Sequence, residues 1–245
     1  MLPIVTQCIF QILFTIPNFI FAMTFFGFFR ALSAHLLGDT TPKEYGHLTL
    51  NPLVQTNTLN IIVFFGSILL SMSIFGESII TTLIMILLWT LGVNAFKEIP
   101  TNPNNFKDPM LDEALSLLTG PIGCITYSML LFACMRFLPF TVQGITTIGS
   151  LQNLVWNFLD EGATIGIFIS ILTLIPLPPQ TGGKIVMLLI PEEYEEVREW
   201  YAEYGMMLFL GLLFLPGIRT VSTTFLTTMT QGIKIMLHTL FFKII

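Results

Sequence analysis

Long apolar segments with very few charged side chains dominate the sequence. They cover about residues 2–37, 61–74, 79–93, 114–138, 165–177 and 206–215. A helix needs about 20 apolar residues to cross the hydrocarbon core of a membrane, so these segments suit full or half crossings. Charged residues make up only 10% of the chain, whereas soluble domains carry about 25%. The sequence therefore predicts an all-α, polytopic integral membrane protein with about six transmembrane or half-spanning helices.

The chain divides by pattern into a membrane domain over residues 1–218 and a C-terminal helix over residues 219–245. The C-terminal segment places apolar side chains at spacings of three and four, as on one face of a helix. These residues are Phe225, Met229, Ile233, Met236 and Leu240. Such a helix either lies at the membrane interface or packs on the membrane domain.

The charged residues restrict the partners. The formal net charge is −5 and the basic residues are scattered, which argues against a nucleic-acid partner. Membrane lipid is the expected surrounding. Asp160 and Glu161 precede the apolar segment at 165–177, where they mark a membrane boundary or, as the alternative, bind a cation or relay protons.

The histidines do not form a zinc-protease motif. His35, His47 and His238 are the three histidines of the chain, and no two of them stand four residues apart. A metal site built from His35, Asp39 and His47 is one interpretation. The other is that Asp39 caps or turns the chain and that both histidines lie at the wet interface.

Four motifs in the polar parts of the chain occur in a recognisable order. They are Leu48-Thr49-Leu50-Asn51-Pro52-Leu53, Lys97-Glu98-Ile99-Pro100-Thr101-Asn102-Pro103, Thr119-Gly120-Pro121 and Pro176-Leu177-Pro178-Pro179-Gln180-Thr181-Gly182-Gly183-Lys184. Over roughly residues 20–215 the chain resembles the site-2 proteases, the intramembrane zinc metalloproteases of peptidase family M50. The resemblance implies a site-2 protease-like core.

The same resemblance implies that the catalytic positions are degenerate. The family's pentapeptide with two zinc-binding histidines and a glutamate corresponds to residues 26–30, where Phe26, Gly27 and Arg30 stand instead. Thr181 stands at the position of the third ligand, an aspartate. Polar family positions are also changed, to Gln55, Asn57 and Cys124. We therefore expect no metal, no other cofactor and no catalytic residues.

The retained motif residues are candidates for structural or client-binding roles. With Arg30 they are Asn51, Pro52, Gln55, Asn102, Pro103, Gly120, Pro121, Pro178, Pro179, Gly182 and Gly183. Because two prolines lack N–H donors and two glycines accept unusual dihedral angles, residues 178–183 are predicted to form irregular backbone beside the centre of the bundle.

Arg30 stands inside an apolar helix, where an unpaired cation is costly. One hypothesis is that its charge replaces that of the metal and bonds to Glu77, Asp160 or free loop carbonyls. The other is that its side chain extends to the membrane interface near His35.

Three functions remain open from the sequence. The first is a catalytically inactive, site-2 protease-like membrane protein that binds a transmembrane client or supports assembly of a membrane complex. The second is a channel-like or transport-associated subunit with a polar path through Arg30, Glu77, Asp160 and Glu161. The third is an active metalloprotease with rearranged ligands. The expected location is the inner (cytoplasmic) membrane of a bacterium.

Overall fold

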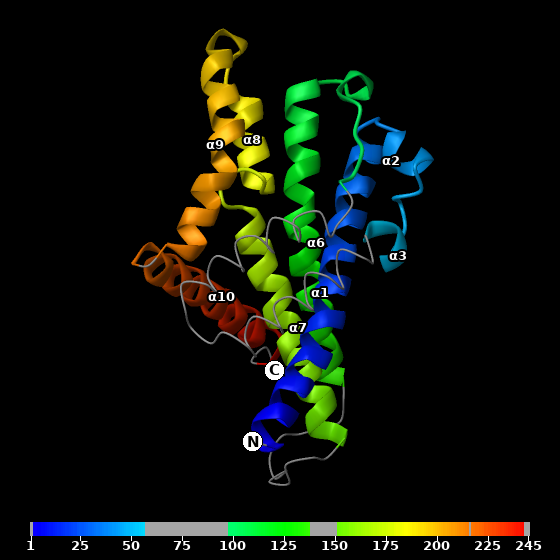
Figure 1. The fold of residues 1–245 in the computed structure, drawn as a ribbon. Coiled ribbons are helices and arrows are strands. Elements are labelled where there is room, and N and C mark those ends of the chain that lie inside the picture. Colours follow the sequence, from blue (N-terminus) through cyan, green and yellow to red (C-terminus); the bar gives the residue numbers. More distant parts are fainter. Residues whose placement is uncertain (1, 57–97, 138–150, 216, 243–245) are drawn as a thin grey trace.

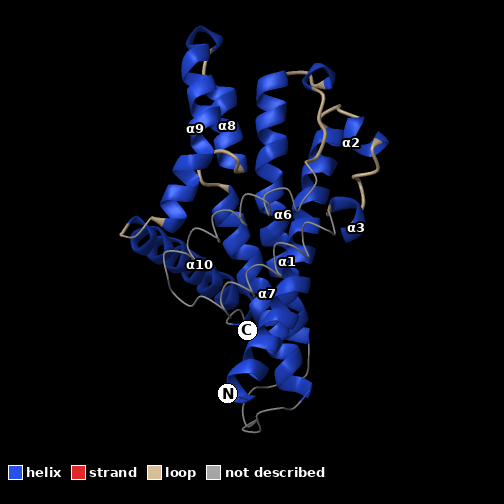
Figure 2. Ribbon diagram, viewed as in Figure 1, coloured by secondary structure: helices blue, strands red, loops and turns tan. Residues whose placement is uncertain are grey.

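The computed structural model describes residues 2–56, 98–137, 151–215 and 217–242, and the elements in these ranges are helices (Figures 1 and 2). In chain order they are α1 (Leu2–Leu36), α2 (Thr41–Glu44), α3 (Pro52–Gln55), the 3-10 helix η2 (Pro103–Asn105), α6 (Pro109–Phe137), α7 (Leu151–Thr173), α8 (Thr181–Leu189), the 3-10 helix η3 (Glu192–Tyr194), α9 (Glu195–Phe214) and α10 (Ile218–Phe242).

Three helices form the centre of the molecule. Helix α6 packs along both α1 and α7, and α1 also contacts α7 (Figure 1). Leu13–Leu36, Pro109–Phe137 and Asn153–Thr173 are each long and apolar enough to cross a membrane. The chain is thus an all-α, polytopic integral membrane protein, as the sequence predicts. The apolar segments at 61–74 and 79–93 lie outside the described residues.

Helix α1 contains the whole first apolar segment in one element. Its 35 residues correspond to about 50 Å at 1.5 Å per residue, which exceeds the roughly 30 Å hydrocarbon core. Pro17 lies within it. Next to Pro17, the Asn18 side chain donates hydrogen bonds to the carbonyl oxygens of Phe14 (2.9 Å) and Phe158 of α7 (3.0 Å). The polar residue in the apolar helix therefore joins α1 to α7.

Small residues let the central helices approach closely, as is common in membranes. A Cβ atom at Gly123 of α6 would lie 2.6 Å from the carbonyl oxygen of Phe25 in α1. At Gly166 of α7 it would collide with Ser128 Oγ of α6. The backbones of α1, α6 and α7 are in direct contact at these positions.

Two helices extend beyond the apolar segments seen in the sequence. Helix α6 begins at Pro109, before the apolar segment at 114–138, because the Asp112 carboxylate accepts backbone N–H groups of Lys107 and Asp108, both at 3.1 Å. The acidic segment from residue 195 and the apolar segment at 206–215 form one helix, α9. No proline separates the two segments, and Gly205 between them packs closely against Pro178.

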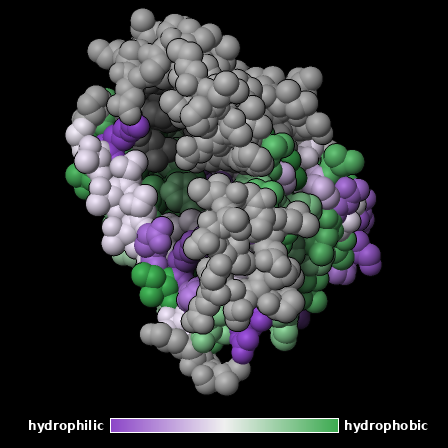
Figure 3. Space-filling view, turned by 90° about the horizontal axis from the view of Figure 1, so that it is seen from below, coloured by the Kyte–Doolittle hydropathy of each residue, from purple (hydrophilic) through white to green (hydrophobic). Residues whose placement is uncertain are grey.

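The C-terminal helices cover one side of the bundle. Helix α8 packs on α6 and α9, and α10 crosses α7 and contacts α9 and α6. Apolar side chains are exposed on the outer faces, including Phe137 (85%) and Val221 (72%), and Figure 3 shows hydrophobic patches on the described surface. Such faces suit contact with lipid. The division of the chain at residue 218 stays a prediction.

Candidate functional site

The first group of predicted site residues lies where α1 meets α6. Gly120 of α6 is buried, and a Cβ atom there would lie 2.6 Å from Cε2 of Phe26 in α1. Pro121, the next residue, is also buried. The phenyl ring therefore fills the space between the two helices, at the position where the resemblance implies a histidine.

Gln55 fills the space beside the neighbouring position, Gly27. A Cβ atom on Gly27 would lie 2.5 Å from Gln55 Oε1. Gln55 is 2% exposed, and its Nε2 donates to the carbonyl oxygens of His47 (2.8 Å) and Thr49 (3.2 Å). Its Oε1 also lies 3.3 Å from His47 Nδ1. An amide with several hydrogen-bond contacts thus occupies the volume next to Gly27, where the resemblance implies a glutamate.

Asn51 and Pro52 explain how α3 places Gln55. Asn51 is the N-cap of α3, and its Oδ1 accepts the backbone N–H of Leu53 at 3.1 Å. Pro52 follows at the first helical position, where its missing N–H has no cost. The single turn that begins there ends at Gln55. These two motif residues therefore have a structural role, which is to fix the turn that brings Gln55 to α1.

Asn102 and Pro103 belong to a second polar turn, fastened by Asp39. Asn102 caps η2 by accepting the N–H of Asn104 at 3.1 Å, and Pro103 is its first residue. Asp39 is fully buried and accepts hydrogen bonds from Asn102 N (2.8 Å), Asn105 Nδ2 (2.9 Å) and Thr41 N (3.0 Å). Burial alone raises the pKa of the Asp39 carboxyl, but these bonds and one from Thr41 Oγ1 hold its pKa below the ordinary value.

Arg30 is buried in α1 without a bonded partner among the described residues. It is 7% exposed, and its Nε atom is fully shielded and makes no hydrogen bond. Glu98 and Glu113 are the carboxylates whose charges act on it. Neither forms an ion pair with it, and Glu98 instead binds Lys184 of α8. The hydrogen bond and charge of Lys184 lower the pKa of Glu98 against a smaller opposing effect of burial.

The predicted partners of Arg30 are placed elsewhere or not described. Asp160 pairs with Lys234 of α10 at 2.8 Å, so the predicted Arg30–Asp160 bond is wrong. Glu77 lies outside the described residues. The interface hypothesis is not supported either, because at 7% exposure the side chain does not extend to an open surface.

The proline and glycine motif forms the turn between α7 and α8. Residues 174–180 are irregular, which includes Pro178 and Pro179. Thr181, Gly182 and Gly183 were predicted to be irregular too, but they are the buried first turn of α8. A Cβ atom on either glycine would strike the backbone of residues 174–178. Glycine is thus needed here for close packing of α8 on the preceding turn.

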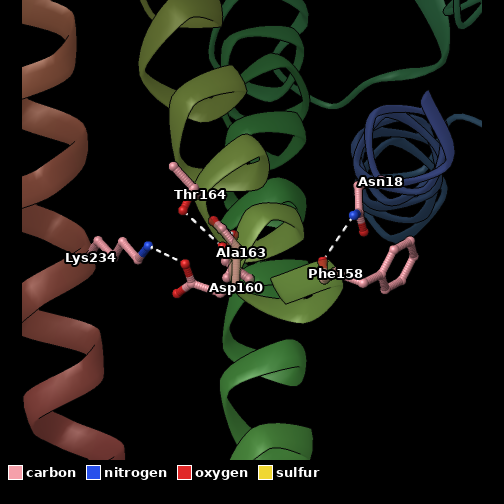
Figure 4. A network of polar contacts seen from close by, with 7 residues as sticks. Asn18, Phe158, Asp160, Ala163, Thr164 and Lys234 are labelled. Carbon is pink, nitrogen blue, oxygen red and sulfur yellow. Dashed lines mark hydrogen bonds and ion pairs between the residues drawn. The ribbon is translucent and has the colours of Figure 1, made fainter. Parts of the chain in front are cut away.

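Asp160 and Glu161 lie in the middle of α7 and inside the candidate span Asn153–Thr173, so the predicted membrane boundary at these residues is wrong. Figure 4 shows Lys234 reaching Asp160 from α10. Glu161 accepts the hydroxyl of Thr15 in α1 at 2.5 Å. Because partners from two other helices satisfy these carboxylates, the helix continues through them.

The polar groups that join the helices at this level were not predicted from the sequence. Asn18 is fully buried, and its Oδ1 accepts the hydroxyl of Tyr127 in α6 at 2.6 Å while its amide binds Phe158 O (Figure 4). The signal was present, since an asparagine in an apolar span is costly unless it is bonded. Its partners, more than 100 residues away, could not be read from local patterns.

The family's zinc does not fit the residues at its expected site. Phe26 and Gly27 have no donor atoms, Arg30 is a cation, and Thr181 offers only a hydroxyl. Within the part of the chain that the structure describes, no three His, Cys, Asp or Glu side chains lie together so as to hold a metal ion. The alternative site fails because Asp39 is committed to its turn and His47 to Gln55.

The fold and these motifs define a helical integral membrane protein, and comparison with known proteins supports a site-2 protease-like family. The chain is 25% identical over 187 residues to the protein named Putative zinc metalloprotease YwhC of Bacillus subtilis (strain 168). The alignment covers 76% of this chain and 74% of that protein. No model of a protein family matches the chain, and no solved structure matches it.

Proposed function

We propose that the protein is a catalytically inactive, site-2 protease-like membrane protein that binds a transmembrane client or supports assembly of a membrane complex. The filled centre carries this proposal. Phe26 packs against Gly120 and Gln55 packs against Gly27. Phe26 and Gly27 stand where the resemblance implies a histidine and a glutamate, so this packing supports the absence of a catalytic centre. A catalytic zinc needs three protein ligands and one open position, which this arrangement does not offer.

The retained turns support a binding role. Asn51, Asn102 and Asp39 still fasten the polar turns around α1, although the residues that would need positioning for catalysis are gone. A scaffold kept without its chemistry is suited to holding another transmembrane segment. The similarity to a protein of Bacillus subtilis supports the bacterial inner (cytoplasmic) membrane as the location that we propose.

The test of inactivity measures zinc and proteolysis on the purified full chain. After a chelator wash and incubation with zinc, we expect less than stoichiometric zinc and no cleavage of a transmembrane substrate in detergent or liposomes. A membrane protease with an intact zinc motif, treated in the same way, is the positive control. Stoichiometric zinc with metal-dependent cleavage would contradict the proposal and favour rearranged ligands.

The test of client binding uses photo-cross-linking in native membranes. A cross-linking residue at Leu53, on α3 beside the centre, is compared with one at Ile235 on α10, because these side chains are similarly exposed at 68% and 65%. We expect a discrete membrane-protein adduct from position 53 and none of the same identity from position 235. Identical products from both positions would indicate random contact in the membrane and contradict a client site at the centre.

One observation favours the channel-like alternative. Asp160 and Glu161 lie within a candidate span, where ionisable side chains are often functional. Both are engaged, by Lys234 and Thr15 respectively, and this favours a structural role. Ion flux through liposomes that contain the protein, abolished by Glu161→Gln, would establish the alternative.

A further inference from the structure

The guanidinium of Arg30 is a buried cation that still has bonding capacity. It makes no hydrogen bond or ion pair with any described residue. Only Nε is both fully shielded and unpaired, so the terminal nitrogens hold part of the 7% of the residue that remains accessible. A guanidinium can bind a carboxylate through its two terminal nitrogens, so the accessible part of Arg30 is a part that can bind an anion.

Among the described residues, the carboxylates whose charges act on this cation do not neutralise it at bonding distance. Glu98 is bound by Lys184, and Glu113 acts on Arg30 only through space. Asp39 is saturated by its turn. Since each of these acids is either committed or out of reach, the positive charge is available to an external anion.

A second unpaired polar group faces the same region. Ser116 Oγ of α6 is completely buried and has no partner. Ser116 lies one turn before Thr119, whose hydroxyl contacts Ser33 Oγ at 2.6 Å and the Phe29 carbonyl at 3.3 Å. These α1 residues flank Arg30 in sequence, so Ser116 is on the side of α6 that meets α1 near Arg30.

The depth of Arg30 indicates the source of the anion. Arg30 is six residues before the end of the span Leu13–Leu36, or about 9 Å along the helix at 1.5 Å per residue. At 7% exposure the Arg30 side chain does not extend to an open surface, so it does not use its length to approach a lipid phosphate beyond the end of the helix. A carboxylate carried on a transmembrane helix can approach at the level of Arg30 itself. Arginine also pairs with a planar carboxylate through two parallel hydrogen bonds.

We propose that Arg30, assisted by Ser116, forms a carboxylate-binding site for an acidic side chain within the transmembrane helix of a client. The proposal rests on the client-binding function above and names the chemistry that the client must carry. The client's carboxylate accepts bonds from the terminal nitrogens of Arg30 and from the Ser116 hydroxyl. It thereby neutralises a charge that is otherwise unpaired at membrane depth.

The test measures binding of synthetic helices to the full-length protein in nanodiscs of zwitterionic lipid. The probes are two fluorescent polyleucine helices that differ at one central position, which is glutamate in one and glutamine in the other. Because hydrogen bonds to charged groups are the stronger ones, we expect wild type to prefer the glutamate helix by about tenfold or more. Arg30→Met should abolish that preference, Arg30→Lys should retain part of it, and Ser116→Ala should reduce it.

The outcomes separate this inference from the proposed function. Equal binding of both helices to wild type would overturn the carboxylate site and leave client binding intact, whereas binding of neither would overturn both. Loss of the preference in anionic lipid would assign the site to lipid phosphate and overturn the inference. Thermal unfolding is used to test whether Arg30→Met is folded. If Arg30→Met is unfolded, the preference for the glutamate helix is compared between wild type and Arg30→Lys instead. A further outcome is that Glu98→Gln destabilises the protein and that the additional change Arg30→Met reverses this effect. That result would show that Glu98 is the internal partner of Arg30, and it would also overturn the inference of a carboxylate site.

Discussion

The side chain of Gln55 lies against the backbone of Gly27, so closely that a Cβ atom on Gly27 would be 2.5 Å from Gln55 Oε1. Gln55 is not free to withdraw, since it donates to two carbonyl oxygens and contacts His47 Nδ1. Any side chain at position 27 would have to displace this amide. The contact therefore ties the absence of a side chain at position 27 to the packing of α3 on α1.

This contact predicts that Gly27→Ala destabilises the protein by about 1–3 kcal/mol, the usual effect of overpacking. The control is Gly232→Ala in α10. A Cβ atom added to Gly232 would meet no neighbouring atom within 4 Å, so alanine should stabilise the helix by up to about 1 kcal/mol. Thermal unfolding in detergent measures both. In a Gln55→Ala background the cost of Gly27→Ala should shrink, and an unchanged cost would show that the collision is not with Gln55.

Much of what depends on local chemistry could be predicted from the sequence. The capped turns at Asn51-Pro52 and Asn102-Pro103 were not predicted, but the signal was present, since asparagine accepts N–H groups and proline starts helices. The long helices α1 and α6 follow from apolar segments that exceed a membrane span.

What could not be predicted depends on distant partners. Read locally, Asp160 and Glu161 precede an apolar segment and suggest a boundary. Their partners Lys234 and Thr15, which lie 74 and 146 positions away, make the two carboxylates compatible with a continuous helix. Asp160 was likewise named as one candidate partner of Arg30 from its charge alone. In the structure Asp160 forms an ion pair with Lys234, because α10 crosses α7 at that level.

Asp39 should make stability depend on pH at the acidic end. The pKa of Asp39 in the folded protein is below the ordinary value of about 3.9. The ionised carboxylate therefore contributes fully to the free energy of unfolding above about pH 3.9, and this contribution is lost as the pH falls through the folded pKa. Asp39→Asn should cost about 1–3 kcal/mol at pH 7, because the amide cannot accept all the N–H donors of the turn. The difference in unfolding temperature between wild type and variant should narrow toward pH 3. Glu199→Gln, on an exposed part of α9, should show neither effect, and a constant difference across pH would contradict the assignment.

Tyr127 should be sensitive to loss of a single oxygen atom. Its hydroxyl donates to the fully buried Asn18 at 2.6 Å, so Tyr127→Phe leaves an amide oxygen unsatisfied between α1 and α6. We expect a loss of about 1–3 kcal/mol in unfolding free energy. Tyr204→Phe is the matched control, because Tyr204 is 40% exposed and its ring contact with Trp200 survives the change. Equal effects of the two substitutions would show that the bond to Asn18 contributes nothing specific.

The last prediction concerns the ion pair between Asp160 and Lys234, which joins α7 to α10 within a candidate span. Asp160→Asn leaves an ammonium without its partner, and Lys234→Met leaves the carboxylate. The double variant leaves neither charge. Each single variant should therefore be less stable than wild type. The double variant should be more stable than the sum of the two single losses predicts, by a coupling energy of about 0.5–3 kcal/mol.

Hydrogen exchange of peptides from residues 218–242 measures whether α10 detaches when the pair is broken. Both single variants should raise exchange there, because Leu237 and the rings of Phe241 and Phe242 pack on the bundle through this helix. The reference pair is Lys184–Glu98, whose side chains are 32% and 69% exposed. A double-mutant cycle on this pair should give a coupling energy of about 0–1 kcal/mol. If the two cycles give the same small coupling, and exchange in α10 is unchanged, the Asp160–Lys234 pair does not fasten the C-terminal helix and the apolar contacts hold it alone.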